Sequence, residues 1–200
     1  MKGKTINCLL LILAIIYTSN FVMGQTMRGP LVISPQINPD NTAIFRFLAP
    51  TAKEVKLDAQ FGKKTLLMTK DSSGIWSVTV GPIEPDMYPY HFVVDGINVS
   101  DPNNSAIFPN EGFQNSIAEI TGNTPLIHTI QNVPQGTLSY RYYYSHELDV
   151  RPVIIYTPPG YEKNTDIKYP VLYLLHGTTD IEETWTKGRH IASGCFHPIN

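Results

Sequence analysis

The strongest structural signal in this chain is the stretch Tyr88-Pro-Tyr-His-Phe-Val-Val-Asp-Gly96. Its aromatic and β-branched residues favour a strand, and Asp95-Gly96 is a strong two-residue signal for a hairpin turn. The stretch therefore predicts a strand that ends at residue 94 and turns sharply into a second strand.

Short apolar runs separated by turn residues surround this hairpin on both sides. They show no helical period, and they are too short and too evenly spaced for long helices. Six or seven strands in a segment of about 95 residues indicate a β-sandwich. The predicted strands are 42–48, 55–59, 64–69, 75–80 and 88–94.

Three aromatic residues of this region raise the question of sugar binding. Trp76 lies in a strand pattern that is more typical of a core residue. Tyr88 and Tyr90 are two residues apart, so they share one face of a strand. That face is either core or an exposed platform, and we take Tyr88 and Tyr90 as weak candidates for carbohydrate-binding residues.

Several of these features together resemble the family 48 carbohydrate-binding modules. They are Phe45-Arg-Phe-Leu-Ala-Pro50, Ile75-Trp76, and the Tyr88 to Gly96 stretch with Asp101-Pro102 after it. The resemblance implies an all-β immunoglobulin-like sandwich over residues 28–122. Starch-binding members carry an aromatic residue just after the Asp-Gly turn, where this chain has Ile97. An aliphatic side chain offers no flat ring to a sugar, which counts against α-glucan and leaves xylan open.

A second segment follows the turn residues Thr121-Gly-Asn-Thr-Pro125. Strand-like composition recurs at 127–130, 136–144 and 151–156. The continuous apolar run Val171-Leu-Tyr-Leu-Leu175 is typical of a parallel strand buried on both faces, and it ends at His176-Gly177.

This segment resembles the esterase D-like α/β-hydrolases, more closely the feruloyl and acetyl-xylan esterases of carbohydrate esterase family 1 and the enterochelin esterases. The matching residues are Tyr156-Thr-Pro-Pro-Gly-Tyr161, Tyr169 to Gly177, and Glu182-Glu-Thr-Trp185. The resemblance implies that residues 125–200 are the first strands of an incomplete α/β-hydrolase domain. It also implies a serine mechanism without metal or organic cofactor. The backbone N–H groups of Gly177 and Thr178 would serve the oxyanion hole, and His176 would be a structural loop residue.

The nucleophile of such an enzyme stands in a Gly-x-Ser-x-Gly motif, and no such motif occurs in the 200 residues. We therefore expect the nucleophile, the acid and the catalytic histidine to lie beyond this chain, and the chain alone to be inactive. Cys195 lies close to His197, but proximity in sequence does not make a catalytic pair.

The first 24 residues are predicted to be a signal peptide. Lys2 and Lys4 precede an apolar run from Cys8 to Ile16, which is shorter than the roughly 20 residues of a membrane span. Cleavage would leave 13 basic residues (15 minus Lys2 and Lys4) against 17 acidic ones, a formal charge of −4. No run of Lys or Arg is present, so nucleic acid and membrane surfaces are poor partners. We expect a periplasmic or extracellular protein with no stable membrane association after cleavage.

Two functions from different classes stay open. The first is the N-terminal portion of a secreted carboxylic ester hydrolase, whose partner is a polysaccharide or acylated oligosaccharide from plants, with an enterochelin-type siderophore ester as a variant. The second is a stand-alone carbohydrate-binding protein. A decayed gene product with exposed apolar strands is the third, functionless alternative.

Overall fold

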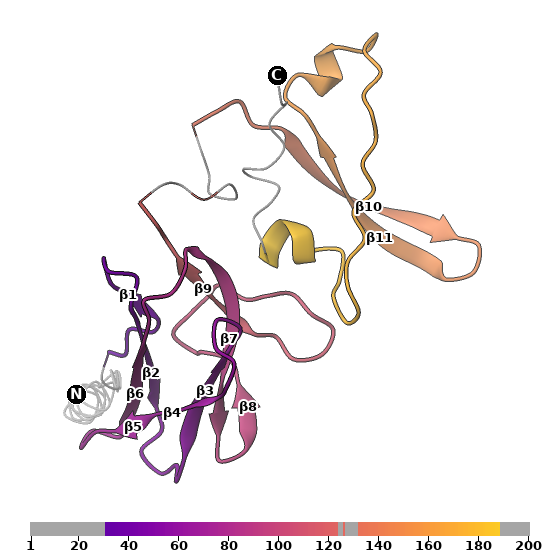
Figure 1. Ribbon diagram of the computed structural model, residues 1–200. Helices are drawn as coiled ribbons and strands as arrows, with labels where there is room; N and C mark the ends of the chain where they lie inside the picture. The colour runs from indigo at the N-terminus through magenta and orange to yellow at the C-terminus, as the bar shows by residue number, and fades with distance from the viewer. Residues whose placement is uncertain (1–30, 124–125, 127–131, 189–200) are drawn as a thin grey trace, which may run out of the picture. The chain divides into compact units, whose positions relative to one another are not determined.

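The structure, a computed structural model, describes residues 31–123, 126 and 132–188 (Figure 1). The predicted signal peptide, the predicted strand at 127–130 and Cys195 lie outside these residues. By internal contacts the chain divides into Met1–Leu31 and Val32–Asn200. The described elements are nearly all strands, and every pairing among them is antiparallel.

Two antiparallel sheets form a β-sandwich, which confirms the all-β fold predicted for this region. One sheet has the order β1-β2-β6-β5, and the other has the order β4-β3-β7-β8 with β9 also paired to β7. The bounds are β1 (Gln36–Ile37), β2 (Ala43–Leu48), β3 (Val55–Ala59), β4 (Leu66–Leu67), β5 (Thr69–Lys70), β6 (Ile75–Val80), β7 (Asp86–Val94), β8 (Ile97–Val99) and β9 (Ser116–Ile120).

The core lies between the two sheets because alternate residues of each strand point inward. In β2 the inward residues are Ala43, Phe45 and Phe47, and all three are buried. Rings from the two sheets meet there: Phe45 contacts Tyr90, and Phe47 contacts Phe92, each pair with ring centroids 4.8 Å apart. Aromatic contact of this kind adds to the burial of apolar area that drives folding.

Trp76 belongs to this core, as its sequence context favoured. Its side chain is buried, and its indole Nε1 donates a hydrogen bond to the carbonyl oxygen of Ala49 at 2.9 Å. The ammonium group of Lys70 lies 5.5 Å from the ring. The ring is therefore enclosed, and Trp76 is no surface platform.

The strand predicted over 64–69 is in fact two short strands in different sheets. β4 pairs with β3, and β5 pairs with β6. Met68 lies between them, where it is buried and its N–H donates to Val55. The side chain of Met68 fills the core at the point where the chain crosses from one layer to the other, so one continuous apolar pattern serves two sheets.

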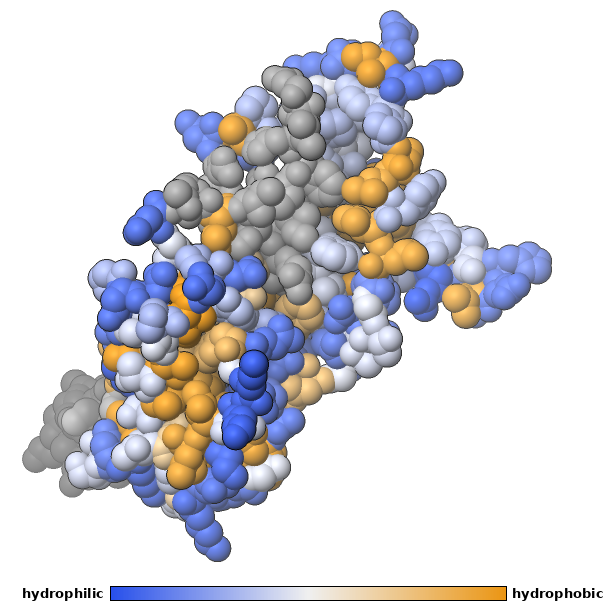
Figure 2. All heavy atoms as spheres, viewed as in Figure 1, coloured by the Kyte–Doolittle hydropathy of each residue, from blue (hydrophilic) through white to orange (hydrophobic). Residues whose placement is uncertain are grey.

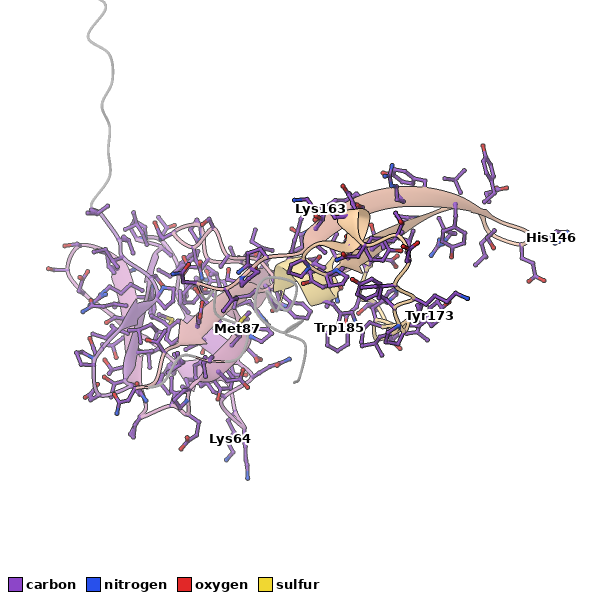
Figure 3. The ribbon with its side chains drawn as sticks, turned by 90° about the horizontal axis from the view of Figure 1, so that it is seen from above. Lys64, Met87, His146, Lys163, Tyr173 and Trp185 are labelled. Atoms are coloured by element: carbon purple, nitrogen blue, oxygen red, sulfur yellow. The ribbon has the colours of Figure 1, made fainter. Side chains whose placement is uncertain are left out.

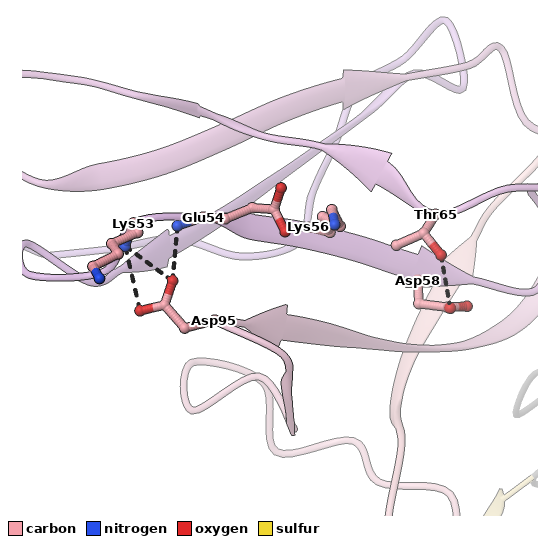
Figure 4. A network of polar contacts seen from close by, with 6 residues as sticks. All are labelled: Lys53, Glu54, Lys56, Asp58, Thr65 and Asp95. Carbon is pink, nitrogen blue, oxygen red and sulfur yellow. Dashed lines mark hydrogen bonds and ion pairs between the residues drawn. The ribbon is translucent and has the colours of Figure 1, made fainter.

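The predicted hairpin is present at Asp95-Gly96, with φ of 48° and 88° at the two residues. Two positive φ values are the signature of a tight hairpin turn that matches strand twist. The Asp95 carboxylate accepts hydrogen bonds from the backbone N–H of Lys53 at 3.0 Å and of Glu54 at 2.8 Å (Figure 4). This side chain therefore ties the β7–β8 turn to the start of β3.

A buried polar network joins β7 to β9 through the loop that follows β8. Tyr90 is 1% exposed, and its hydroxyl donates to the Asp101 carboxylate at 2.8 Å. The amide of Asn104 donates to the Tyr90 oxygen at 3.0 Å, and the Asp101 N–H donates to Ser116 at 2.8 Å. Burial, and after it the charge of Asp101, raise the pKa of Tyr90 far above its ordinary value.

The segment after the sandwich contains one long hairpin and two short helical turns. β10 (Thr137–Ser145) pairs with β11 (Asp149–Thr157), and the hairpin turns at His146 (Figure 3). The helical turns are η1 (Tyr161–Lys163) and η2 (Thr184–Gly188). Hydrophobic residues lie on the surface around this hairpin (Figure 2). None of the helices in the described ranges is long and apolar enough to cross a membrane.

The prediction of a buried parallel strand at 171–175 is wrong for this structure. No strand is assigned there, and all five side chains are exposed, from 44% at Leu174 to 85% at Leu175. A buried parallel strand needs a neighbour on each side and cover on both faces. Among the described residues no strand pairs with this run. The α/β-hydrolase fold predicted for residues 125–200 is therefore not seen.

Replacing Tyr90 with phenylalanine tests the buried network. Tyr90→Phe keeps the ring but leaves the buried Asp101 carboxylate without one of its donors. We expect the free energy of unfolding in urea to fall by about 1–3 kcal/mol at pH 7. An unchanged value would show that the hydroxyl does not support the fold.

The same variant should alter the dependence of stability on alkaline pH. Unfolding exposes a phenol with an ordinary pKa of about 10, whereas the pKa of folded Tyr90 is raised. The stabilisation from keeping this proton is thus present below pH 10 and is lost as the pH rises above it. From pH 9 to pH 11 the wild type should lose more stability than Tyr90→Phe, by up to about 1.4 kcal/mol per pH unit. Parallel pH profiles would contradict the assignment.

The Asp95 turn makes a separate prediction. Asp95→Ala removes two acceptor contacts and places alanine at positive φ, so we expect a loss of about 1–2 kcal/mol in unfolding free energy. Asp95→Asn is the matched control, because asparagine tolerates the left-handed conformation and keeps one acceptor oxygen. Urea denaturation should rank the proteins wild type, then Asp95→Asn, then Asp95→Ala.

Candidate functional site

One candidate site lies on the outer face of the sheet that contains β7. Asp58 of β3 stands opposite His91 of β7, and both point away from the core because their neighbours Leu57 and Phe92 point into it. His91 Nδ1 and Asn115 Oδ1 are 2.9 Å apart and form a hydrogen bond. The ring of Phe113 meets the His91 ring edge-on, with centroids 5.2 Å apart. We call Asp58, His91, Phe113 and Asn115 the His91 patch.

The His91 patch combines a partly open ring with polar groups. Phe113 is 36% exposed, and the Asp58 carboxylate accepts from Thr65 at 3.1 Å. Sites for small neutral ligands use apolar surface for contact and a few placed polar groups for orientation. The patch thus places one partly exposed ring beside an imidazole and an amide group.

The two tyrosines predicted from sequence lie on the opposite, inward face of the same strand. Tyr90 is enclosed in the core and offers no ring to a sugar. Tyr88 is half-buried: its ring packs edge-on against Phe61, and its hydroxyl donates to the Glu84 carbonyl at 3.0 Å. Burial raises the pKa of Tyr88. A role of Tyr88 in binding stays a prediction.

Sequence reasoning missed the His91 patch for an identifiable reason. The period of two places Tyr88 and Tyr90 on one face of the strand, but the period alone does not show whether that face or the opposite one is buried. Phe92 is fully buried and shares the tyrosine face, which makes that face the core and turns His91 outward. Phe113 lies in the loop before β9, and no pattern in the sequence marks it. Ile97, which stands where an aromatic was sought, is exposed.

A second candidate site is the turn that follows the apolar run. The N–H of Asp180 donates to the Gly177 carbonyl at 3.3 Å and closes the turn. A side-chain carbon at Gly177 would lie 3.3 Å from an oxygen of Asp180, so any other residue here would require a small shift of this carboxylate. Within the described residues, neither the Gly177 nor the Thr178 N–H meets a protein acceptor. We call residues 177–180 the Gly177 turn.

Neighbouring side chains of this turn contact the loop itself. His176 Nδ1 lies 2.9 Å from the carbonyl oxygen of Gly177, and Trp185 Nε1 donates to the Leu175 carbonyl at 3.2 Å. Trp185 thus bonds the end of the exposed run, to which the labelled Tyr173 also belongs (Figure 3). The contact of His176 is within the loop, in line with the structural loop role expected for it. The oxyanion role of Gly177 and Thr178 stays a prediction.

No cluster of three or more His, Cys, Asp or Glu side chains in the described ranges is arranged to hold a metal ion.

No protein-family model matches the chain. An endo-1,4-beta-xylanase/feruloyl esterase of Xylanibacter ruminicola is 28% identical to it over 165 residues. That match covers 80% of this chain, and the chain spans 23% of the length of the relative. The chain is therefore similar to one portion of a polysaccharide-degrading enzyme.

Among solved structures, pullulanases show likeness to part of the chain. A mutant Paenibacillus barengoltzii pullulanase complexed with maltotetraose shares 24% identity, with a TM-score of 0.33 over 44% of this chain and 15% of that one. Klebsiella pneumoniae pullulanase complexed with maltotriose shares 24% identity, with a TM-score of 0.34 over 44% of this chain and 9% of that one. Likeness at these TM-scores does not bear on function.

Proposed function

We propose that this chain is the N-terminal portion of an exported carboxylic ester hydrolase that acts on plant polysaccharide esters. The similarity to the xylanase/feruloyl esterase carries the proposal. It covers 80% of the chain, whereas residues 28–122 make up less than half of it. The similarity therefore extends beyond the sandwich into the residues that follow.

The chemistry proposed for the second segment is serine-dependent ester hydrolysis. Attack on an ester builds negative charge on its carbonyl oxygen, and donors fixed in advance at that position accelerate such reactions by roughly 10²–10³. The Gly177 and Thr178 N–H groups, which have no acceptor in the described part of the chain, are available for this role. The nucleophile, acid and histidine are proposed to come from residues beyond position 200.

The role proposed for the sandwich is that of an immunoglobulin-like, family 48-type carbohydrate-binding module. The His91 patch would offer a xylan chain one aromatic ring and nearby polar groups. Binding of the polymer would raise the concentration of its acyl groups near the ester-cleaving domain. Export through residues 1–24 would bring the protein to such a substrate, in the periplasm or outside the cell.

The second candidate function is a stand-alone carbohydrate-binding protein. It is favoured by one observation: the sandwich has its own core and contains the whole His91 patch. Under this alternative, the strands after residue 132 would have no catalytic purpose.

The first test concerns ester cleavage. Residues 25–200 should not hydrolyse methyl ferulate or p-nitrophenyl acetate, since no Gly-x-Ser-x-Gly motif is present. Sequencing of the coding DNA past codon 200 should reveal that motif and a later histidine, in the same or a shifted frame. The protein extended by those residues should release ferulate or acetate from arabinoxylan, and replacement of the motif serine by alanine should abolish release. Unrelated DNA after codon 200 would exclude the esterase.

The second test concerns binding. In native gels that contain arabinoxylan, residues 25–200 should migrate more slowly than in plain gels. Phe113→Ala removes the ring of the patch and should weaken binding by about 1 kcal/mol, or roughly fivefold. Tyr144→Ala is the matched control, because Tyr144 is 87% exposed on the separate β10–β11 hairpin. Equal retardation of both variants would contradict a role for the His91 patch.

A further inference from the structure

The loop between β8 and β9 contacts the Gly177 turn, although about 70 residues separate them in sequence. The Glu111 N–H donates to the Thr179 carbonyl at 2.9 Å. The Asn110 amide nitrogen donates to Thr179 Oγ1 at 3.0 Å and to Asp180 Oδ1 at 3.2 Å. Asn110 and Asp180 also form an isolated β-bridge. Backbone and side chain of one loop thus hold the second half of the turn, Thr179 and Asp180.

A buried hydroxyl strengthens the same contact. Thr184 is buried, and its hydroxyl donates to the Pro109 carbonyl at 3.2 Å while accepting from the Ile181 N–H at 3.1 Å. Pro109 is itself buried. The hydroxyl of Thr184 therefore both donates and accepts a hydrogen bond. A buried hydroxyl without these partners would cost free energy, so the two bonds favour this arrangement. The start of η2 is therefore fixed to the same loop.

The orientation of Asn110 is set before it reaches the turn. Its Oδ1 accepts from the Gly112 N–H at 2.8 Å within its own loop, so its amide nitrogen must point outward. The amide nitrogen of Asn110 bonds Thr179, whose backbone has a positive φ of 68°. A β-branched residue rarely adopts this left-handed conformation without support from its surroundings.

We propose that Asn110 is a positioning residue that fixes the Gly177 turn from the sandwich. The role of the Gly177 turn as an oxyanion loop rests on the proposed function. The contact of Asn110 with Thr179 and Asp180 does not depend on that function. Phe113 lies three residues further along the same loop, so the ring proposed to bind sugar and the contacts to Thr179 and Asp180 belong to one segment. A polymer bound at Phe113 would then lie on the element that sets the position of those donors.

Asn110→Asp tests the contact sharply. The change keeps the size of the side chain and the acceptor for Gly112, but it replaces two donor contacts with a negative charge beside Asp180. In residues 25–200, we expect the hydrogen-exchange protection of the Glu111 and Asp180 amides to fall by roughly tenfold at pH 7. Protection of amides in the β2–β6 and β3–β7 pairs should not change.

Two further variants make the outcome specific. Asn110→Asp combined with Asp180→Asn exchanges donor and acceptor, and should restore most of the protection. Asn103→Ala, which alters an exposed asparagine between the same two strands, should have no effect on the turn. Acidification below about pH 4 should also restore protection in Asn110→Asp alone, because protonation of a carboxyl returns a donor.

Unchanged exchange of Glu111 and Asp180 in Asn110→Asp would overturn the inference, as would failure of the exchanged pair to recover. Both results are independent of ester cleavage. If the contact is found but the DNA past codon 200 encodes no nucleophile, Asn110 still positions the turn, and only the proposed esterase fails.

Discussion

The hydrogen bond from the Tyr90 hydroxyl to the buried Asp101 carboxylate is the contact on which the sandwich depends most. β7 pairs with β3, β8 and β9, so it is the strand through which that sheet is connected. Tyr90 lies within β7, packs its ring on Phe45 of the other sheet, and uses its hydroxyl to hold the loop after β8. A charge taken out of water must be matched by donors, and the Asn103 N–H is another donor to the Asp101 carboxylate. The network therefore links both sheets and the loop. Position 90 needs a ring that packs on Phe45 and a donor that reaches Asp101, and tyrosine has both.

Much of this arrangement could be predicted from sequence because strands with one buried face alternate strictly. The bounds of β3 and β6 and the hairpin at Asp95-Gly96 follow from local pattern alone. The burial of Asp101 could not be predicted, since an Asp-Pro-Asn-Asn stretch reads as solvated loop whatever lies beneath it. The crossing at Met68 was hidden for a similar reason: Leu66-Leu67-Met68 is one continuous apolar run, and only the pairing of its two sides with different sheets reveals the break.

The apolar run at 171–175 shows that sequence pattern alone does not predict burial. Its composition predicts a strand buried on both faces, but burial is a property of neighbours and not of the run itself. In the described residues no strand pairs with it, and its side chains stay exposed. The candidate sites follow the same logic. Gly177 and Thr178 could be named as candidates from sequence because the esterase resemblance rests on contiguous residues, whereas Asp58, His91 and Asn115 are brought together only by strand register.

The loop from residue 108 to 115 connects these separate observations. It was not marked by sequence, because Pro, Asn, Glu and Gly in succession are ordinary loop residues. Yet Asn110 reaches the Gly177 turn and Asn115 bonds His91, so the two ends of one segment take part in the two candidate sites. The two ends of the loop bond each other, because the Phe108 N–H donates to the Asn115 carbonyl at 2.8 Å. The loop is therefore closed at its base, with Asn110 and Phe113 both inside it. Only three positions separate Asn110 from Phe113 in sequence. This short spacing limits how far a polymer bound at Phe113 can lie from the Gly177 turn.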